Sequence, residues 1–160
     1  MNDNTRETAA VITATLARCD RITAGFCDLQ PLLQGVMPLT VDGLSRLDTP
    51  QRIASVALLK RYEQLQDIVG RLGRAVAAWE LEDVQEMTRR DFANWLEKAE
   101  IVTSAEHWVA ATYLRNRLVH EYPLAEAEQI DRVNACWQGL PPLVTMVERL
   151  REHLARRGFA

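Results

Sequence analysis

The sequence predicts an all-α protein of five or six helices that form a single domain over residues 1–160. Apolar residues recur at spacings of three and four in every long segment, which is the pattern of amphipathic helices. No segment shows the strict alternation of apolar and polar residues that a half-buried strand requires. The composition, with 48% hydrophobic and 26% charged residues, suits one globular domain with a buried core.

The first half of the chain predicts two long helices joined by a loop. Residues 5–34 form the first helix, because apolar side chains recur there at helical spacing. Residues 35–48 contain two glycines and one proline, and we expect a loop that is long for a helix connection. Thr49 and Pro50 then give an N-cap followed by proline at the first helical position, and the pattern continues for about 28 residues. So long a helix suggests a bundle axis or a dimer surface.

The second half of the chain predicts shorter helices. Residues 80–87 are acidic and aperiodic, so we expect a connection there. Thr88 with Asp91 then predicts the start of a short helix. Residues 124–138 can also be helical, and the Gly-Leu-Pro-Pro run at 139–142 is expected to break or kink that helix before a last, arginine-rich segment.

Residues 103–123 form the helix with the most unusual composition. Thr103 and Glu106 predict a capping box at its start, and Pro123 predicts its end. At about 100° per residue, one face of this helix is apolar and should point to the core. Its members are Trp108, Ala111, Leu118 and Val119, with Leu114 at the edge.

Polar residues crowd the last two turns of the same helix. Arg115 projects within the apolar face, where a charge costs free energy unless something pairs with it or uses it. Asn116 and His120 are four residues apart, so their side chains are neighbours beside that face. The same flank of the helix carries Val109 and Tyr113. Tyr122 returns toward Arg115, whereas Arg117 and Glu121 should form an exposed pair.

Each of these residues also has a purely structural interpretation. Arg115 could pair with a carboxylate of the long helix, such as Glu63 or Asp67. His120 could interact with the last carbonyls of its helix, and Tyr122 could be a core residue with a satisfied hydroxyl. The other histidines, His107 and His153, have no partner pattern and are assigned to the surface.

Charge and cysteine usage restrict the function. The net charge of −3 argues against a surface that attracts nucleic acid everywhere, so any RNA or DNA binding needs a local basic site. The N-terminal residues lack the pattern of a signal peptide, and no apolar run reaches the roughly 18 residues of a membrane span. Three cysteines without metal-ligand spacing then predict reduced thiols and a cytoplasmic protein without a membrane anchor.

The segment RNRLVHEYP, residues 115–123, contains the pattern R-x4-H-x-Y. Together with the stretch that precedes it from residue 88, it resembles the HEPN superfamily, in particular the HepT-type toxins of prokaryotic toxin–antitoxin pairs. The resemblance implies a HEPN-like helical bundle that acts as a homodimer and cleaves RNA without metal or cofactor. It places Arg115, Asn116 and His120 in the catalytic site.

The chemistry of these residues fits that role. Cleavage without metal needs a base that removes the proton of the 2′-hydroxyl. It also needs a positively charged side chain that stabilises the negative charge of the developing phosphorane. Histidine exchanges protons near neutral pH, which suits His120 to the first task, and Arg115 can bind phosphate through two parallel hydrogen bonds. The two residues diverge by roughly 140° on an ideal helix, so a second helix or a second subunit must complete the cleft.

The resemblance also implies a partner. In HepT-like pairs a minimal nucleotidyltransferase antitoxin adenylylates the tyrosine of the motif, which is Tyr122 here. The alternative is a non-catalytic subunit that binds a nucleotide or substrate for such a nucleotidyltransferase, with Arg115, Asn116 and His120 gripping phosphate. A third interpretation is a structural helical interaction protein, in which Arg115 and His120 are buried in ion pairs.

Overall fold

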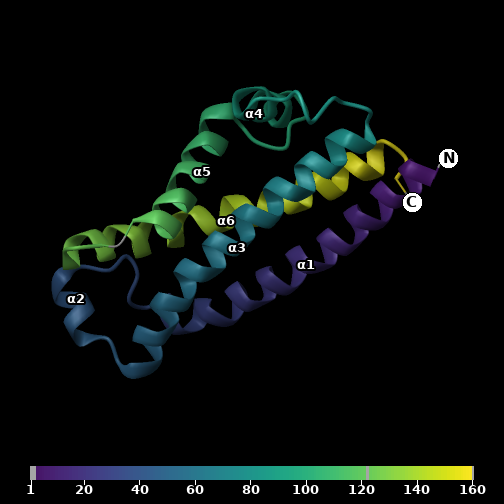
Figure 1. Cartoon of the computed structure of the whole chain (residues 1–160). Coiled ribbons are helices and arrows are strands. Elements are labelled where there is room, and N and C mark those ends of the chain that lie inside the picture. The colour runs from purple at the N-terminus through teal and green to yellow at the C-terminus, as the bar shows by residue number, and fades with distance from the viewer. Residues whose placement is uncertain (1–2, 122, 160) are drawn as a thin grey trace.

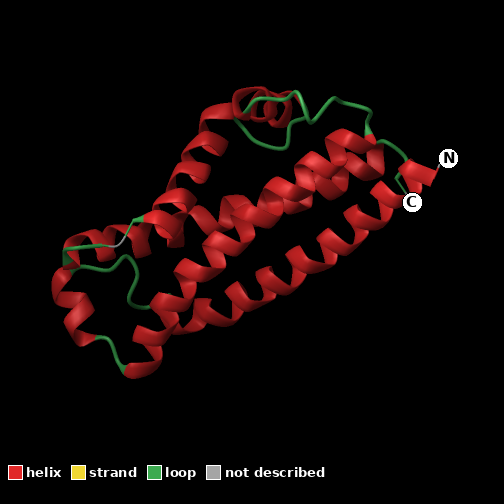
Figure 2. Ribbon diagram, in the orientation of Figure 1, coloured by secondary structure: helices red, strands yellow, loops and turns green. Residues whose placement is uncertain are grey.

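The computed structural model describes residues 3–121 and 123–159, and all regular structure within them is helical (Figures 1 and 2). This confirms the prediction of an all-α chain with five or six helices for the described residues. None of the helices in these ranges is both long enough and apolar enough to cross a membrane. The elements are α1 (Asp3–Leu33), α2 (Val41–Arg46), α3 (Thr49–Trp79), α4 (Arg89–Lys98), α5 (Ala105–His120) and α6 (Glu126–Arg156).

Three helices of 31 residues each, α1, α3 and α6, run along the length of the molecule (Figure 1). At 1.5 Å per residue each is about 46 Å long. Helix α3 is the axis, because it contacts α1, α5 and α6. From Ala54 to Ala77, each turn of α3 has at least one buried side chain, among them Leu58, Leu65, Leu72 and Val76. The long second helix therefore is the bundle axis that its length suggested.

Most helix starts carry the local signals that the sequence displays. Asp48 caps α3, one residue before the predicted Thr49, and forms a capping box with Gln51. Thr88 and Asp91 form the predicted box at α4. The predicted loop over 35–48 was wrong in part, because it contains α2, whose first turn is capped by Thr40.

Helix α6 continues through Pro141 and Pro142, so of the predicted break or kink at 139–142 the break does not occur. A proline inside a helix costs about 3 kcal/mol, whereas burying one large apolar side chain contributes about 1.5–3 kcal/mol. The residues on either side of the prolines, Leu140 and Leu143, are almost fully buried, and many more follow. Gly139 also lets α3 approach closely, because a Cβ there would lie 2.7 Å from Cε2 of Tyr62. Tertiary packing therefore holds the helix together.

Helix α5 begins one residue later than the sequence suggests. Ser104, not Thr103, is its N-cap and accepts a hydrogen bond from the His107 amide. Thr103 instead contacts the His107 ring, with Oγ1 and Nδ1 2.8 Å apart. The predicted capping box is absent because the third residue after the Ser104 cap is His107, and Glu106 instead contacts Arg90 of α4 at 2.7 Å.

Two further assignments were wrong. Val119 is 43% exposed, although it was placed on the core-facing stripe of α5. His153 is buried rather than on the surface, and its Nε2 lies 2.8 Å from Oε1 of Glu80. That pair joins the C-terminal ends of α3 and α6, and Arg157 contacts the same carboxylate at 2.9 Å. The spacing of residues along one helix could not reveal a partner on another.

Candidate functional site

Successive turns of α3 hold α5 in place. The Tyr62 hydroxyl donates to the Ala111 carbonyl at 3.1 Å, and the Gln66 amide donates to Thr112 Oγ1 at 3.0 Å. Burial raises the pKa of Tyr62, so its hydroxyl stays protonated and remains a donor. One turn further, Gly70 leaves room for Trp108, since a Cβ there would lie 3.2 Å from the indole ring. The sequence thus places a regular row of small and polar residues on α3 beneath α5.

Arg115 extends from α5 toward α3 and meets a carboxylate. Its Nη2 lies 3.1 Å from Oδ1 of Asp67, one of the two acids that the sequence offered as partners. The Arg115 side chain is 27% exposed, and its Nε is buried without a hydrogen-bond partner among the described residues. An arginine on the apolar face is therefore paired, yet it retains an unused donor and access to solvent.

Asn116 is joined to Arg115 rather than to His120. Its Oδ1 accepts a hydrogen bond from Nη1 of Arg115 at 3.2 Å. The guanidinium is thus held by Asp67 on one side and by Asn116 on the other. These two contacts fix the orientation of the guanidinium group. Without them the long arginine side chain would adopt many orientations.

His120 is the last residue of α5 and is exposed. Its ring makes no hydrogen bond or ion pair with any residue in 3–121 or 123–159. Within the chain the fold brings together Arg115 and Asn116 but leaves His120 apart, as the angle along the helix predicts. Tyr122 lies outside the described residues.

One exposed strip of α5 nevertheless links His120 to Asn116. Positions 109, 113, 116 and 120 repeat at spacings of four and three, so they share one flank of the helix. Val109 is 44% exposed and Tyr113 is 64% exposed. We call these four residues the α5 strip. It combines two large side chains open to solvent with an amide and an imidazole.

The C-terminal end of α5 is fixed by α6. Arg132 is buried, and its Nη1 donates to the Glu121 carbonyl at 2.6 Å. Glu121 also forms the predicted pair with Arg117, at 3.2 Å, and its carboxylate lies 3.6 Å from Arg132 Nη2. The backbone directly after His120 is therefore anchored to another helix.

A hollow of about 440 Å³ opens beside the α5 strip, between α5, α3 and the start of α4. We call it the arginine groove, because Arg71, Arg74, Arg89 and Arg115 all line it. Asp67 is the one acid in its lining, against four arginines in a chain of net charge −3. A concentration of one charge sign in a concave surface attracts anions.

The arginines of this groove are held in different ways. Arg71 Nε lies 3.1 Å from the second carboxylate oxygen of Asp67, so that acid joins Arg71 to Arg115. Arg74 stacks over Phe92, with its guanidinium carbon 4.4 Å from the ring centroid, and donates to the Val84 carbonyl at 3.5 Å. Arg89 is exposed and has no ion pair with any described residue.

The sequence did not predict that Arg71, Arg74 and Arg89 belong to this site. The available signal was weak: Arg71 and Arg74 lie three apart on one helix, and Arg89 opens the next. Only the turn between α3 and α4 brings these two places together.

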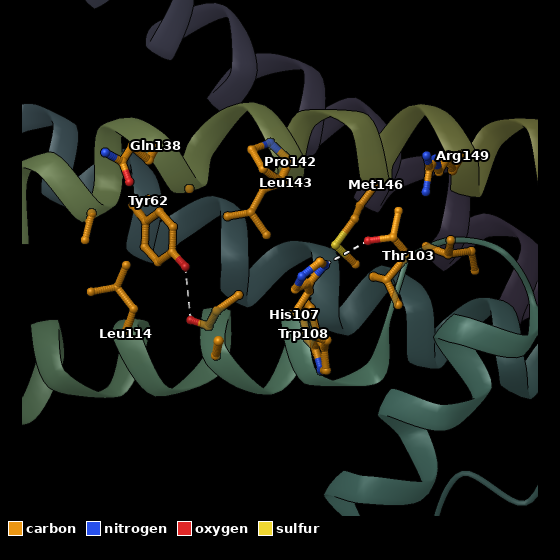
Figure 3. Close-up of a pocket in the computed structure, with 16 residues that line it drawn as sticks. Tyr62, Thr103, His107, Trp108, Leu114, Gln138, Pro142, Leu143, Met146 and Arg149 are labelled. Atoms are coloured by element: carbon orange, nitrogen blue, oxygen red, sulfur yellow. Dashed lines mark hydrogen bonds between the residues drawn. The ribbon is translucent and has the colours of Figure 1, made fainter. Parts of the chain in front are cut away.

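A second hollow of about 440 Å³ lies on the opposite flank of α5, between α5 and α6 (Figure 3). We call it the apolar cleft. Tyr62, Leu114, Leu143 and Met146 lie along it, with Gln138 toward one end and Arg149 at the other. The contact between Thr103 and His107 lies near the Arg149 end. Arg115, Asn116 and His120 do not line this cleft.

Within the described ranges, no three His, Cys, Asp or Glu side chains are arranged to hold a metal ion. In comparisons with known proteins the chain matches no family model, no curated protein and no solved structure.

Proposed function

We propose that this protein is a HEPN-like, metal-independent endoribonuclease that acts as a homodimer, with Arg115, Asn116 and His120 as its catalytic residues. One observation carries the proposal. Arg115 and Asn116 are hydrogen bonded to each other at 3.2 Å and line an arginine-rich hollow, while His120 of the same motif is exposed five residues later. A phosphate clamp and an accessible base are the two groups that RNA cleavage without metal needs.

In this reaction His120 removes the proton from a 2′-hydroxyl, and the 2′-oxygen attacks the adjacent phosphorus. The bond between phosphorus and the 5′-oxygen then breaks, and that oxygen takes up a proton. The products are a 2′,3′-cyclic phosphate and a 5′-hydroxyl. Arg115 stabilises the charge on the phosphorane, for which the substrate phosphate must displace or share its contact with Asp67.

A second copy of the chain would bring a His120 close to an Arg115, which a single chain does not do. His120 and Arg115 do not share a hollow in one protomer, so two α5 strips that face each other would place one histidine near the other's arginine. The exposure of Val109 and Tyr113 on this strip supports such a contact, because burying them against a second copy contributes favourable free energy. The second His120 could then return a proton to the leaving 5′-oxygen.

The cleavage test uses purified protein and a chelator. His120→Ala should lower the cleavage rate by about 10²–10⁴, and Arg115→Ala by about 10²–10³. The matched control is His107→Ala, which removes the exposed histidine from the other flank of α5 and should leave the rate unchanged. Undiminished cleavage by the His120 variant would remove this histidine from the mechanism.

The proposal includes regulation by a nucleotidyltransferase antitoxin that adenylylates Tyr122. The support is the place of this tyrosine two residues after His120 in the sequence. An anionic nucleotide there would compete with substrate phosphate for Arg115. Co-expression with a minimal nucleotidyltransferase should add the mass of one AMP to the chain, and Tyr122→Phe should prevent it. Modification of the variant to the same extent would rule out Tyr122 as the target.

The second candidate function is a non-catalytic nucleotide-binding subunit. It is favoured by the separation of His120 from the arginine groove within one protomer, since four arginines can grip phosphates without a base. Calorimetry with ATP distinguishes the two. Binding of ATP together with absence of RNA cleavage would favour the binding subunit.

A further inference from the structure

We propose that Arg71, Arg74 and Arg89 form a track for the phosphates of a single RNA strand, which leads from Arg115 to the start of α4. This rests on the proposed function, because it names where the substrate of that site lies. The motif contributes one arginine to the groove, and the other three come from α3 and the first turn of α4. Cleavage at one phosphate does not require these three additional arginines.

The length of the groove suits a strand rather than one phosphate. From Asp67, which contacts Arg115, to Arg74 the helix α3 rises about 10 Å. Successive nucleotides of one strand advance about 3.4 Å in a duplex and further when extended, so two or three phosphates can lie along this distance. Arg89 extends the row of positive charge beyond Arg74 at the edge of the groove.

The groove is also arranged to hold its charges in place before a ligand arrives. Asp67 orients Arg71 and Arg115, and the Phe92 ring and the Val84 carbonyl orient Arg74. Preorganised donors lose less side-chain entropy when they bind phosphate. Arg89 remains without an ion pair among the described residues, so its charge is available to a ligand without the loss of an existing contact.

Salt dependence of RNA binding tests this track. The protein carries His120→Ala, so that the RNA stays intact, and a fluorescein-labelled single-stranded RNA is titrated at several KCl concentrations. Adding Arg89→Ala should weaken binding by about threefold to tenfold and reduce the slope of log K against log salt by about 0.7, which is the contribution of one phosphate contact in a single strand. Arg89→Lys should retain the slope, because it keeps the charge.

The matched control is Arg46→Ala, which removes an exposed arginine from α2, away from α4 (Figure 1). It should leave both the affinity and the slope unchanged. Equal slopes for the Arg89 and Arg46 variants would overturn the track. So would binding of ATP to this groove in a protein that does not bind the labelled RNA.

The outcomes separate this inference from the proposed function, because binding is measured in a variant that lacks the base. If wild-type protein does not cleave RNA but Arg89→Ala lowers the slope, the track stands and the nuclease proposal falls. If wild-type protein cleaves RNA and the slope does not change, the nuclease proposal stands and the track falls.

Discussion

The two flanks of α5 carry hollows of equal size and opposite chemistry. The arginine groove and the apolar cleft each have a volume of about 440 Å³, and Trp108 borders both. Four arginines line the groove, whereas Arg149 is the one arginine that lines the cleft. Size therefore does not indicate which hollow is the better candidate for a binding site. What distinguishes the groove is that charged groups from three helices converge in it and that the motif residues Arg115 and Asn116 take part.

The difference follows from what α5 presents on each side. Ala110, Ala111 and Leu114 face the cleft, and the two small alanine side chains leave a space between α5 and α6. On the other side Thr112 and Arg115 form polar contacts with α3. A single helix thus separates a hollow that reflects incomplete packing from one that is built from oriented charges.

The largest effect that would sharpen this comparison is expected from Asp67→Asn. The substitution removes the acid that holds Arg71 and Arg115, and it adds one net positive charge to the groove. RNA should bind a few times more tightly, because repulsion is lost, while the cleavage rate should fall about tenfold because Arg115 loses its orientation. The RNA affinity is measured in protein that also carries His120→Ala, and the cleavage rate is measured in protein that retains His120.

Glu63→Gln is the control for Asp67, since it makes the same charge change on α3 at a residue paired with Lys60. It should leave the cleavage rate unchanged. If the Asp67 variant lost affinity and rate together, the groove would owe its function to shape rather than to charge.

An intermediate effect is expected from Gly139→Ala, which tests the opposite flank. The new Cβ would lie 2.7 Å from the ring of Tyr62, and overpacking of this kind costs about 1–3 kcal/mol. Better helix propensity returns up to about 1 kcal/mol, so the net loss of stability should be about 1 kcal/mol. Denaturant unfolding measures it, and RNA affinity should not change.

Gly35→Ala provides the control for Gly139, because a Cβ at that position meets nothing within 4 Å. It should not reduce stability. A loss of RNA affinity in the Gly139 variant as large as in the Arg89 variant would contradict the division of roles between the two hollows.

The smallest effect concerns the start of α4, which carries Arg89 at the edge of the groove. Hydrogen bonds from the Thr88 hydroxyl and amide hold the pKa of Asp91 below its usual value of 3.8. A lowered pKa means that ionised Asp91 stabilises the fold above about pH 3.8 and that this contribution is lost as the pH falls through the lowered value. Asp91→Ala should therefore reduce the melting temperature slightly at neutral pH. In strong acid the melting temperatures of the variant and the wild type should be equal. If they still differed there, the effect would come from helix propensity rather than from the ionised carboxylate.

The sequence predicted those parts of the fold that local chemistry determines. The start of α4 followed from Thr88 and Asp91, and the position of Arg115 on an apolar face led to its pairing with Asp67. The chain does not break at Pro141 and Pro142, one of the two outcomes predicted there, because buried neighbours on other helices outweigh the local cost. The arginine groove was not found, since Arg74 and Arg89 come together only through the turn that joins α3 to α4.

The bond between Arg132 and the Glu121 carbonyl has a consequence for how α5 can move. The first turn of α5 is joined to α4, through Glu97 at the Ala105 amide and through Arg90 at Glu106. The residue directly after its last turn, Glu121, is held to α6 by Arg132 instead. A swing of α5 away from α6 that keeps the Arg132 bond would therefore pivot at its C-terminal end, and it would have to break the hydrogen bonds that Tyr62 and Gln66 of α3 make to α5. The apolar cleft would widen most at Arg149, and His120, next to the pivot, would travel least.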